Sequence, residues 1–166
     1  MMIVECYNDE FMIRKLATGV KIKHEKGIGN VILRTFAHTN VIGMIDEDGT
    51  QANPKLFQSH YTLIEDAKDM KIYRKNSDTT NMIVELCPAL EGWLINRASW
   101  CGLSMRDFGL PDNRADLFKL KRLDGDKRYD RFLKCLDRKR RTDAETEKID
   151  PGDRRIKSFH TVAGPA

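Results

Sequence analysis

The chain has 166 residues, of which 40% are hydrophobic and 33% charged, and its formal net charge is +4. This length suits one domain, or one domain with an extension, and allows a core of useful size. The composition is typical of a soluble globular protein. No apolar run approaches the length of a membrane span, and residues 1–5 show no signal-peptide pattern, so we expect a cytoplasmic protein without a membrane partner.

Short β-branched runs alternate with helical spacing in the first part of the chain. The expected elements are a strand at 2–4, a helix from about residue 10 that Gly19 ends, a strand at 20–24, a helix at 28–36 and a strand at 41–45. Asn8 or Asp9 is the expected cap of the first helix. Two helices between three strands imply a βαβαβ unit and hence a parallel sheet. Its carboxyl ends share one edge, where open α/β sheets bind ligands.

The middle of the chain continues the α/β pattern. We expect a helical or irregular stretch at 53–69, a strand at 70–73, a polar loop at 75–81, a strand at 82–86 and a helix at 89–101. The predicted fold is therefore a compact α/β domain with a central, mostly parallel sheet of four to five strands flanked by helices.

The sequence changes character after Gly102. Two amphipathic helices are expected at 114–123 and 128–137, and the chain is charged and poor in large apolar residues beyond them. This pattern divides the chain into an α/β domain at 1–103, a helical C-terminal extension at 104–137 and a charged, mobile tail at 138–166.

Two acids stand at the end of the third predicted strand. Side chains alternate along a strand, so Asp46 and Asp48 face one way and Glu47 the other. Two adjacent carboxylates repel each other, and such a pair is tolerated where it holds a cation, shares a proton or faces open water. The pattern therefore favours a divalent metal site.

A third acid, Glu5, follows the first predicted strand. If the first and third strands are neighbours, Glu5, Asp46 and Asp48 converge at one edge. Such hard oxygen ligands suit Mg²⁺ or Mn²⁺ with room for a phosphate, and the ion would polarise a phosphoryl oxygen. Acids at strand ends also occur simply as helix caps and in loops.

The segments IVECYND, GIGN and VIGMIDEDG together resemble a TOPRIM domain. That family, found in topoisomerases, bacterial primases, OLD-type nucleases and recombination proteins, has a Glu after its first strand and a DxD after its third, on a four-stranded parallel sheet. The resemblance implies that Glu5 is a general acid/base or metal ligand and that Asp46 and Asp48 bind Mg²⁺. The chain departs from the pattern at Cys6, where the family usually has Gly, and a side chain there narrows the approach of a phosphate backbone.

The segment ELCPALEGWL resembles the start of a helix in small stand-alone TOPRIM-like proteins and OLD-type domains. Together with the segments above, the resemblance covers residues 1–100. By that resemblance Glu91 points toward the acidic site. The alternative is a first-turn Glu favoured by the helix dipole. His24 lies near a strand end and could approach the acidic site. A lone His in such a position more often has a structural role. Gly27 and Gly29 match no phosphate-binding fingerprint, so a tight turn is the expected reading.

The four cysteines, Cys6, Cys87, Cys101 and Cys135, show neither CxxC nor zinc-finger spacing, and we expect reduced, mostly buried thiols. A basic segment lies near the C-terminus and predicts either contact with a phosphate backbone or a solvated helical face. The residues assigned to nucleic-acid binding are Lys127, Arg128, Arg131, Lys134, Arg138, Lys139, Arg140 and Arg141.

The expected function is Mg²⁺-dependent chemistry on nucleic-acid phosphodiesters, as in a nuclease of DNA repair or defence. The alternative is a non-catalytic TOPRIM module that binds nucleic acid or a partner protein. An ATPase is the expected partner in that case, because OLD-type domains are joined to one. A receiver-like phosphoacceptor would need a further Asp after its central strand and a later Lys, a set that the sequence does not place.

Overall fold

The computed structural model describes residues 1–47, 54–120 and 122–147, and describes only the backbone of residues 54 and 140–147. The strands are β1 (Met2–Val4), β2 (Ile22–His24), β3 (Ile42–Asp46), β4 (Tyr61–Ala67), β5 (Met70–Lys75) and β6 (Asp78–Leu86). The helices are α1 (Tyr7–Leu16), α2 (Ile28–Ala37), α4 (Pro54–His60), α5 (Ala89–Trp100), the 3₁₀ helix η1 (Met105–Phe108), α6 (Arg114–Lys119) and α7 (Lys127–Glu147). Among the described residues, no helix is both long and apolar enough to span a membrane.

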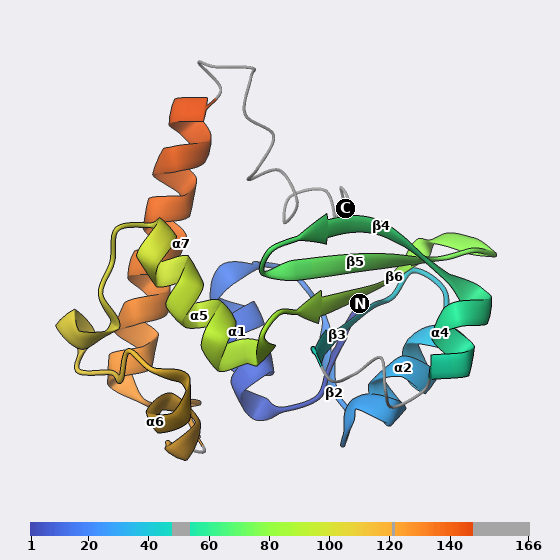
Figure 1. Cartoon of the computed structure of the whole chain (residues 1–166), viewed down its shortest axis with the longest axis horizontal. Helices are drawn as coiled ribbons and strands as arrows, with labels where there is room; N and C mark the ends of the chain where they lie inside the picture. The colour runs from blue at the N-terminus through green and yellow to red at the C-terminus, as the bar shows by residue number, and fades with distance from the viewer. Residues whose placement is uncertain (48–53, 121, 148–166) are drawn as a thin grey trace.

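The described strands form one six-stranded mixed sheet in the order β2-β1-β3-β6-β5-β4 (Figure 1). Strands β2, β1, β3 and β6 run parallel, and the hairpin of β4 and β5 pairs antiparallel to β6. Strand β1 lies between β2 and β3, which confirms the α/β class and the expected βαβαβ unit. The chain passes from β1 to β2 on one side and returns to β3 on the other, which makes the carboxyl ends of β1 and β3 a topological switch point.

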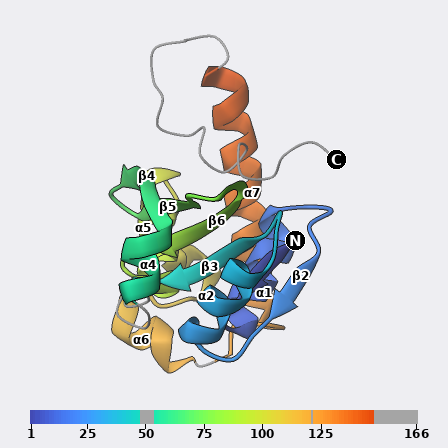
Figure 2. The same cartoon turned by 90° about the vertical axis from the view of Figure 1, so that its right-hand side faces the viewer.

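Each face of the sheet has its own hydrophobic cluster, because successive strand side chains point to opposite faces. Met44 packs with residues of α1, α5 and α7, whereas the next residue, Ile45, packs with residues of α2 and α4. Figure 1 shows α1, α5, α6 and α7 gathered on one side of the sheet, and Figure 2 shows α2 and α4 on the side toward the viewer. The helical extension therefore shares its core with the α/β part of the chain.

The sheet is wider than the sequence predicted. Residues 61–67, expected to be helical or irregular, form the edge strand β4, and β6 begins at Asp78 inside the predicted polar loop. Most side chains of β4 are exposed, so the strand lacks the apolar alternation that marks a half-buried strand. Its β-branched and aromatic residues, beginning with Tyr61, were the available signal.

The C-terminal helices also differ from expectation. Helix α6 ends at Lys119, and α7 continues to Glu147, so ten residues assigned to the tail, 138–147, are helical. Strong helix formers such as Arg, Lys, Glu and Ala dominate that stretch, so the helix persists without an apolar face. Residues 148–166, also assigned to the tail, lie outside the described residues.

The close packing of β3 on α2 gives a first prediction. A side chain at Gly43 would collide with Thr35 Oγ1 and lie 3.3 Å from Val31 Cγ1. We expect Gly43→Ala to lower the free energy of unfolding by about 1–3 kcal/mol in urea denaturation. Gly29→Ala is the matched control, since nothing lies within 4 Å of that position and alanine favours a helix. Equal stability of the wild type and Gly43→Ala would contradict the close packing.

Candidate functional site

Four carboxylates gather at the carboxyl edge of the parallel strands. Glu5 follows β1 and Asp46 ends β3, and these strands are hydrogen-bonded neighbours as the sequence interpretation required. Asp9 from the first turn of α1 and Glu91 from the first turn of α5 also belong to this group. The negative charge of each raises the pKa of Asp46. The cluster thus draws on two strand ends and two helix starts, each delivering one acid.

Asp46 lies at the centre of this acidic site. Its Oδ1 accepts a hydrogen bond of 3.0 Å from the backbone N–H of Leu90 at the start of α5. Burial raises the pKa of Asp46 to about 7, and the charges of Asp9, Glu91 and then Glu5 add to the shift. The Leu90 bond opposes the shift but does not cancel it, so Asp46 gains its proton near neutral pH.

Asp9 is the site residue that sequence reasoning missed, since it appeared only as a possible helix cap. The N-cap of α1 is instead Cys6, and Asp9 closes a capping box with it. Asp9 Oδ2 accepts from the Cys6 N–H at 3.0 Å, while the Asp9 N–H donates to Cys6 Sγ at 3.4 Å. Burial, with a smaller contribution from Glu91, raises the pKa of Asp9 to about 6. The signal in the sequence that could have identified Asp9 was its position one helical turn after Glu5.

Cys6 serves as a structural cap. Burial and the neighbouring Asp9 carboxylate raise the pKa of its thiol far above the ordinary range. The thiol therefore stays protonated at neutral pH and is a poor nucleophile. The cysteines Cys6, Cys87, Cys101 and Cys135 all carry free thiols, as expected. The expectation that they are mostly buried was wrong, because Cys87 is buried and the other three are partly exposed.

The helical extension contributes a buried tyrosine next to the acids. Tyr129 of α7 is fully buried, and its hydroxyl has no hydrogen-bond partner among the described residues. Burial and the charges of Asp9, Cys6 and Glu91 raise the pKa of Tyr129 well above its usual value. Its ring stacks on Phe11 of α1, with 5.8 Å between the ring centroids. A neutral O–H donor from α7 is thus held beside the carboxylates.

The acids suit a divalent cation by chemistry, since hard cations prefer carboxylate oxygens. Within residues 1–47, 54–120 and 122–147, no three His, Cys, Asp or Glu side chains are grouped closely enough to hold an ion as they lie. The other half of the predicted DxD pair, Asp48, lies outside the described residues. The carboxylate oxygens therefore fit Mg²⁺ or Mn²⁺ by their chemistry. The described acids do not, as they lie, surround a single point where an ion could bind.

The remaining candidates near this edge have structural explanations. The His24 ring stacks on the Tyr7 ring, with 4.4 Å between their centroids. Gly27 caps α2 with a φ of 80°, a left-handed conformation that favours glycine, and Gly29 lies inside the helix. The conformation of Gly27 agrees with the tight turn that the sequence predicted, whereas for Gly29 that prediction was wrong.

The basic residues predicted to bind nucleic acid do not all lie on the same face of α7. Lys127, Arg131, Lys134 and Arg138 are exposed and follow one another at helical spacing, opposite the face that buries Tyr129. Arg128 is instead paired with Asp126 at 2.7 Å and donates to the Gly109 carbonyl at 2.9 Å. Lys139 is exposed, and the side chains of Arg140 and Arg141 are outside the described part.

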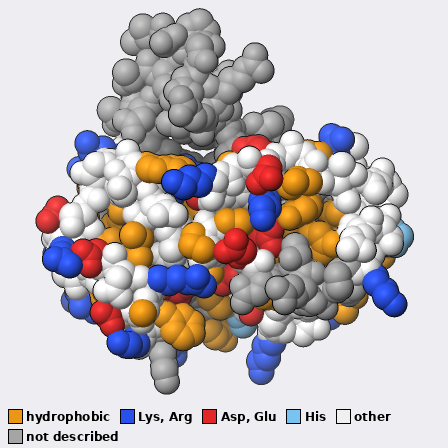
Figure 3. Space-filling model, viewed as in Figure 1, with side chains coloured by type: hydrophobic (Ala, Val, Ile, Leu, Met, Phe, Trp, Pro, Cys, Tyr) orange, Lys and Arg blue, Asp and Glu red, His pale blue; other side chains and the backbone are white. Residues whose placement is uncertain are grey.

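The cationic stripe of Lys127, Arg131, Lys134 and Arg138 has an acidic neighbour. One of its members, Lys134, pairs with Asp130 at 2.7 Å. On the face of the molecule drawn in Figure 3, Lys and Arg are interspersed with Asp and Glu. The stripe also points away from the carboxylates, since Tyr129 occupies the inner face of the same helix.

No protein-family model, curated protein or solved structure matches this chain. The TOPRIM resemblance therefore stays a prediction that depends on the residues themselves.

The raised pKa values predict how stability depends on pH. The folded-state pKa values of Asp46 and Asp9 lie above the ordinary 3.8, so the native state binds more protons than the unfolded state between about pH 4 and 7. The stability contributed by these protons is complete below pH 4 and is lost as the pH rises to 7. We expect Asp46→Asn, which keeps an acceptor for Leu90, to be more stable than the wild type at pH 8 by on the order of 2 kcal/mol. Urea unfolding in EDTA at pH 4, 6 and 8 measures this difference, which shrinks toward pH 4.

Asp130→Asn is the control of opposite sign. Lys134 and Lys15 hold the pKa of Asp130 below its usual value, so its stabilising contribution is present at neutral pH and fades as the pH falls. We expect this variant to be less stable than the wild type at pH 8. A pH-independent difference between Asp46→Asn and the wild type would contradict the buried, mutually repelling site.

Proposed function

We propose that the chain is a TOPRIM-like, Mg²⁺-dependent protein that acts on phosphodiester bonds of nucleic acid, as a nuclease does. One observation carries the proposal: Asp9 and Asp46 are largely buried beside Glu5 and Glu91, and no Lys or Arg of the described residues forms an ion pair with Asp9, Asp46 or Glu91. Buried like charges are costly. A divalent cation would offset their repulsion.

The other buried acids differ from those of the acidic site, because they have cationic partners. Asp69 lies 2.7 Å from Arg97, and Glu85 lies 3.8 Å from Lys71 and accepts a hydrogen bond from the Tyr73 hydroxyl. These acids have cationic or O–H partners, as buried charges usually do. The lack of an ion pair with any described Lys or Arg at Asp9, Asp46 and Glu91 therefore supports a site built for an external cation.

The TOPRIM resemblance assigns roles that agree with this arrangement. A bound Mg²⁺ or Mn²⁺ would polarise a phosphoryl oxygen and favour formation of hydroxide. Asp46 would hold the ion together with Asp48, and Glu5 would move a proton to or from the reacting group. Asp9 and Glu91 add negative charge that strengthens cation binding, and the Asp46 bond to Leu90 fixes one of its oxygens.

The departure at Cys6 has a structural explanation. Its thiol accepts from the Asp9 N–H, so it acts as a cap for α1. The cationic stripe on α7 supports a nucleic-acid partner, since its exposed cations attract a phosphate backbone, although the stripe points away from the acids.

A non-catalytic module that binds nucleic acid or a partner such as an ATPase is the second candidate. Two observations favour it: the described acids do not close around one point, and the cationic stripe points away from them. Cleavage by the purified chain alone separates the two functions.

The cleavage test uses the purified chain with labelled DNA and RNA in Mg²⁺, in Mn²⁺ and in EDTA. We expect metal-dependent cleavage that Glu5→Gln and Asp46→Asn each lower by at least about a hundredfold, the usual contribution of a positioned acid or base. Glu10→Gln is the matched control, because Glu10 lies next to Asp9 but pairs with Arg14 at 2.6 Å. Cleavage that survives in both site variants would rule out these roles.

Metal binding has a readout independent of cleavage. Mg²⁺ should raise the melting temperature of the wild type at pH 8, because ligands that bind only the native state stabilise it. The increase should be lost in Asp46→Asn and retained in Glu10→Gln. A Mg²⁺ effect together with no cleavage would favour the binding module over the enzyme.

A further inference from the structure

An exposed aromatic side chain follows Glu5 closely in the chain. Tyr7 is the first residue of α1, two positions after Glu5, and 57% of its surface is exposed. Aromatic residues normally stabilise a fold by burying their large apolar area. Tyr7 contributes little in this way, so its position needs another explanation.

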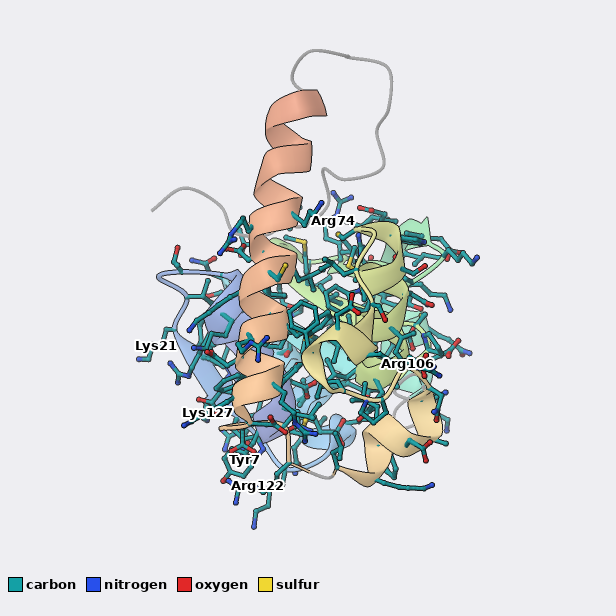
Figure 4. The ribbon with its side chains drawn as sticks, turned by 90° about the vertical axis from the view of Figure 1, so that its left-hand side faces the viewer. Tyr7, Lys21, Arg74, Arg106, Arg122 and Lys127 are labelled. Atoms are coloured by element: carbon teal, nitrogen blue, oxygen red, sulfur yellow. The ribbon has the colours of Figure 1, made fainter. Side chains whose placement is uncertain are left out.

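The Tyr7 ring belongs to a group of three side chains from separate parts of the chain. It stacks on the His24 ring of β2 at 4.4 Å with an interplanar angle of 17°. The guanidinium of Arg122, from the loop between α6 and α7, lies over the Tyr7 ring at 5.7 Å from its centroid. Figure 4 shows Tyr7 and Arg122 next to each other at the lower edge of the molecule, with Lys127 above them. We name Tyr7, His24 and Arg122 the aromatic platform.

The fold holds this platform in place. Asn8 Oδ1 accepts hydrogen bonds from the N–H groups of Leu123 at 2.8 Å and Asp124 at 3.3 Å, which fixes the loop against the start of α1. The Asp124 carboxylate in turn accepts from Arg122 Nε at 3.1 Å and Nη2 at 2.9 Å. The guanidinium is therefore oriented while its side chain stays 74% exposed. Such a residue is available to a ligand from solvent.

The platform adjoins the carboxylates. His24 pairs in register with Val4, the residue before Glu5, and its charge lowers the pKa of Asp9. Tyr7 is separated from Glu5 only by Cys6. His24 stacks on the Tyr7 ring and Arg122 lies over it, so a flat molecule would stack on the part of the ring that stays exposed. Its neighbouring groups would then lie next to the acidic site.

We propose that the aromatic platform binds an unpaired base of single-stranded DNA or RNA and presents the adjoining phosphodiester to the acidic site. This inference rests on the proposed function and narrows its substrate class to unpaired strands. Base faces are hidden inside a duplex, whereas in a single strand they stack on aromatic rings without regard to sequence. Arg122 Nε and Nη2 bond to Asp124, so the remaining N–H groups of the guanidinium are the ones that suit a phosphate oxygen or a base edge.

The chain offers a matched control for a non-specific aromatic effect. Trp100 is 54% exposed, and the guanidinium of Arg97 lies 4.8 Å from its ring centroid. It stands at the opposite end of α5 from Leu90, roughly 15 Å away along the helix axis. Trp100 therefore reproduces the exposed ring and nearby Arg of the platform at a place remote from the acids.

The test is fluorescence anisotropy with the full chain and labelled strands of about 12 nucleotides, within the length that one stacking groove covers. Single-stranded DNA, single-stranded RNA and duplex DNA are compared with Ca²⁺ in place of Mg²⁺, and gels check that the strands stay intact. We expect the wild type to bind a single strand at least about tenfold more tightly than the duplex, and Tyr7→Ala to lose about tenfold for the single strand alone.

Further variants separate stacking from folding. Tyr7→Phe keeps the π face and should bind like the wild type, whereas Tyr7→Leu keeps a large apolar side chain without a π face and should match Tyr7→Ala. Arg122→Gln should reduce the slope of log affinity against log salt by about one. Trp100→Ala should bind normally. Equal binding by the wild type and Tyr7→Leu, or an equal loss in Trp100→Ala, would overturn the platform.

The same samples, moved to Mg²⁺, separate this inference from the proposed function. Tyr7-dependent binding of single strands without any cleavage would overturn the enzymatic proposal and leave the platform standing. Cleavage with binding that ignores Tyr7 would overturn the platform and leave the enzyme standing. Preference for DNA or for RNA in the two single-stranded arms identifies which nucleic acid the platform accepts.

Discussion

The parallel pairing of β1 with β3 is the constraint on which the candidate site depends. It makes the two strand ends neighbours at a switch point, so the chain leaves them on different sides and the acids lie at the shared carboxyl edge. Asp46 is then drawn to the start of α5 by its bond from Leu90. The partial positive charge of a helix N-terminus favours a carboxylate, yet burial and the neighbouring acids still raise the pKa of Asp46.

The helical extension completes this edge of the molecule. Helix α7 covers the acids from one side through Tyr129, and the loop before it is tied to α1 through Asn8. The same loop places Arg122 over the Tyr7 ring. Removing the extension would therefore expose the acids and dismantle the aromatic platform together, because both depend on how α7 packs against α1.

The sequence interpretation succeeded where local patterns carry the information. Alternation and β-branched runs located β1 and β3, and the acids that follow them fixed Glu5 and Asp46 as neighbours once a βαβαβ unit was assumed. It failed for β4, whose exposed side chains leave no periodic signal, and for Asp9, whose place at a helix start looked like an ordinary cap. The role of Asp48 and the TOPRIM assignment stay predictions.

The sequence by itself determined the kind of chemistry that is available. Short-range periodicity reveals the order of strands and helices, and with it which acids follow a strand. Only the tertiary structure decided which charges stay uncompensated. Salt bridges join residues far apart in the chain, such as Arg97 with Asp69, and sequence spacing does not reveal them. The packing of α1, α5 and α7 withholds such a partner from Asp9 and Asp46 and leaves the Tyr7 ring in solvent, because burial is a property of the assembled layers.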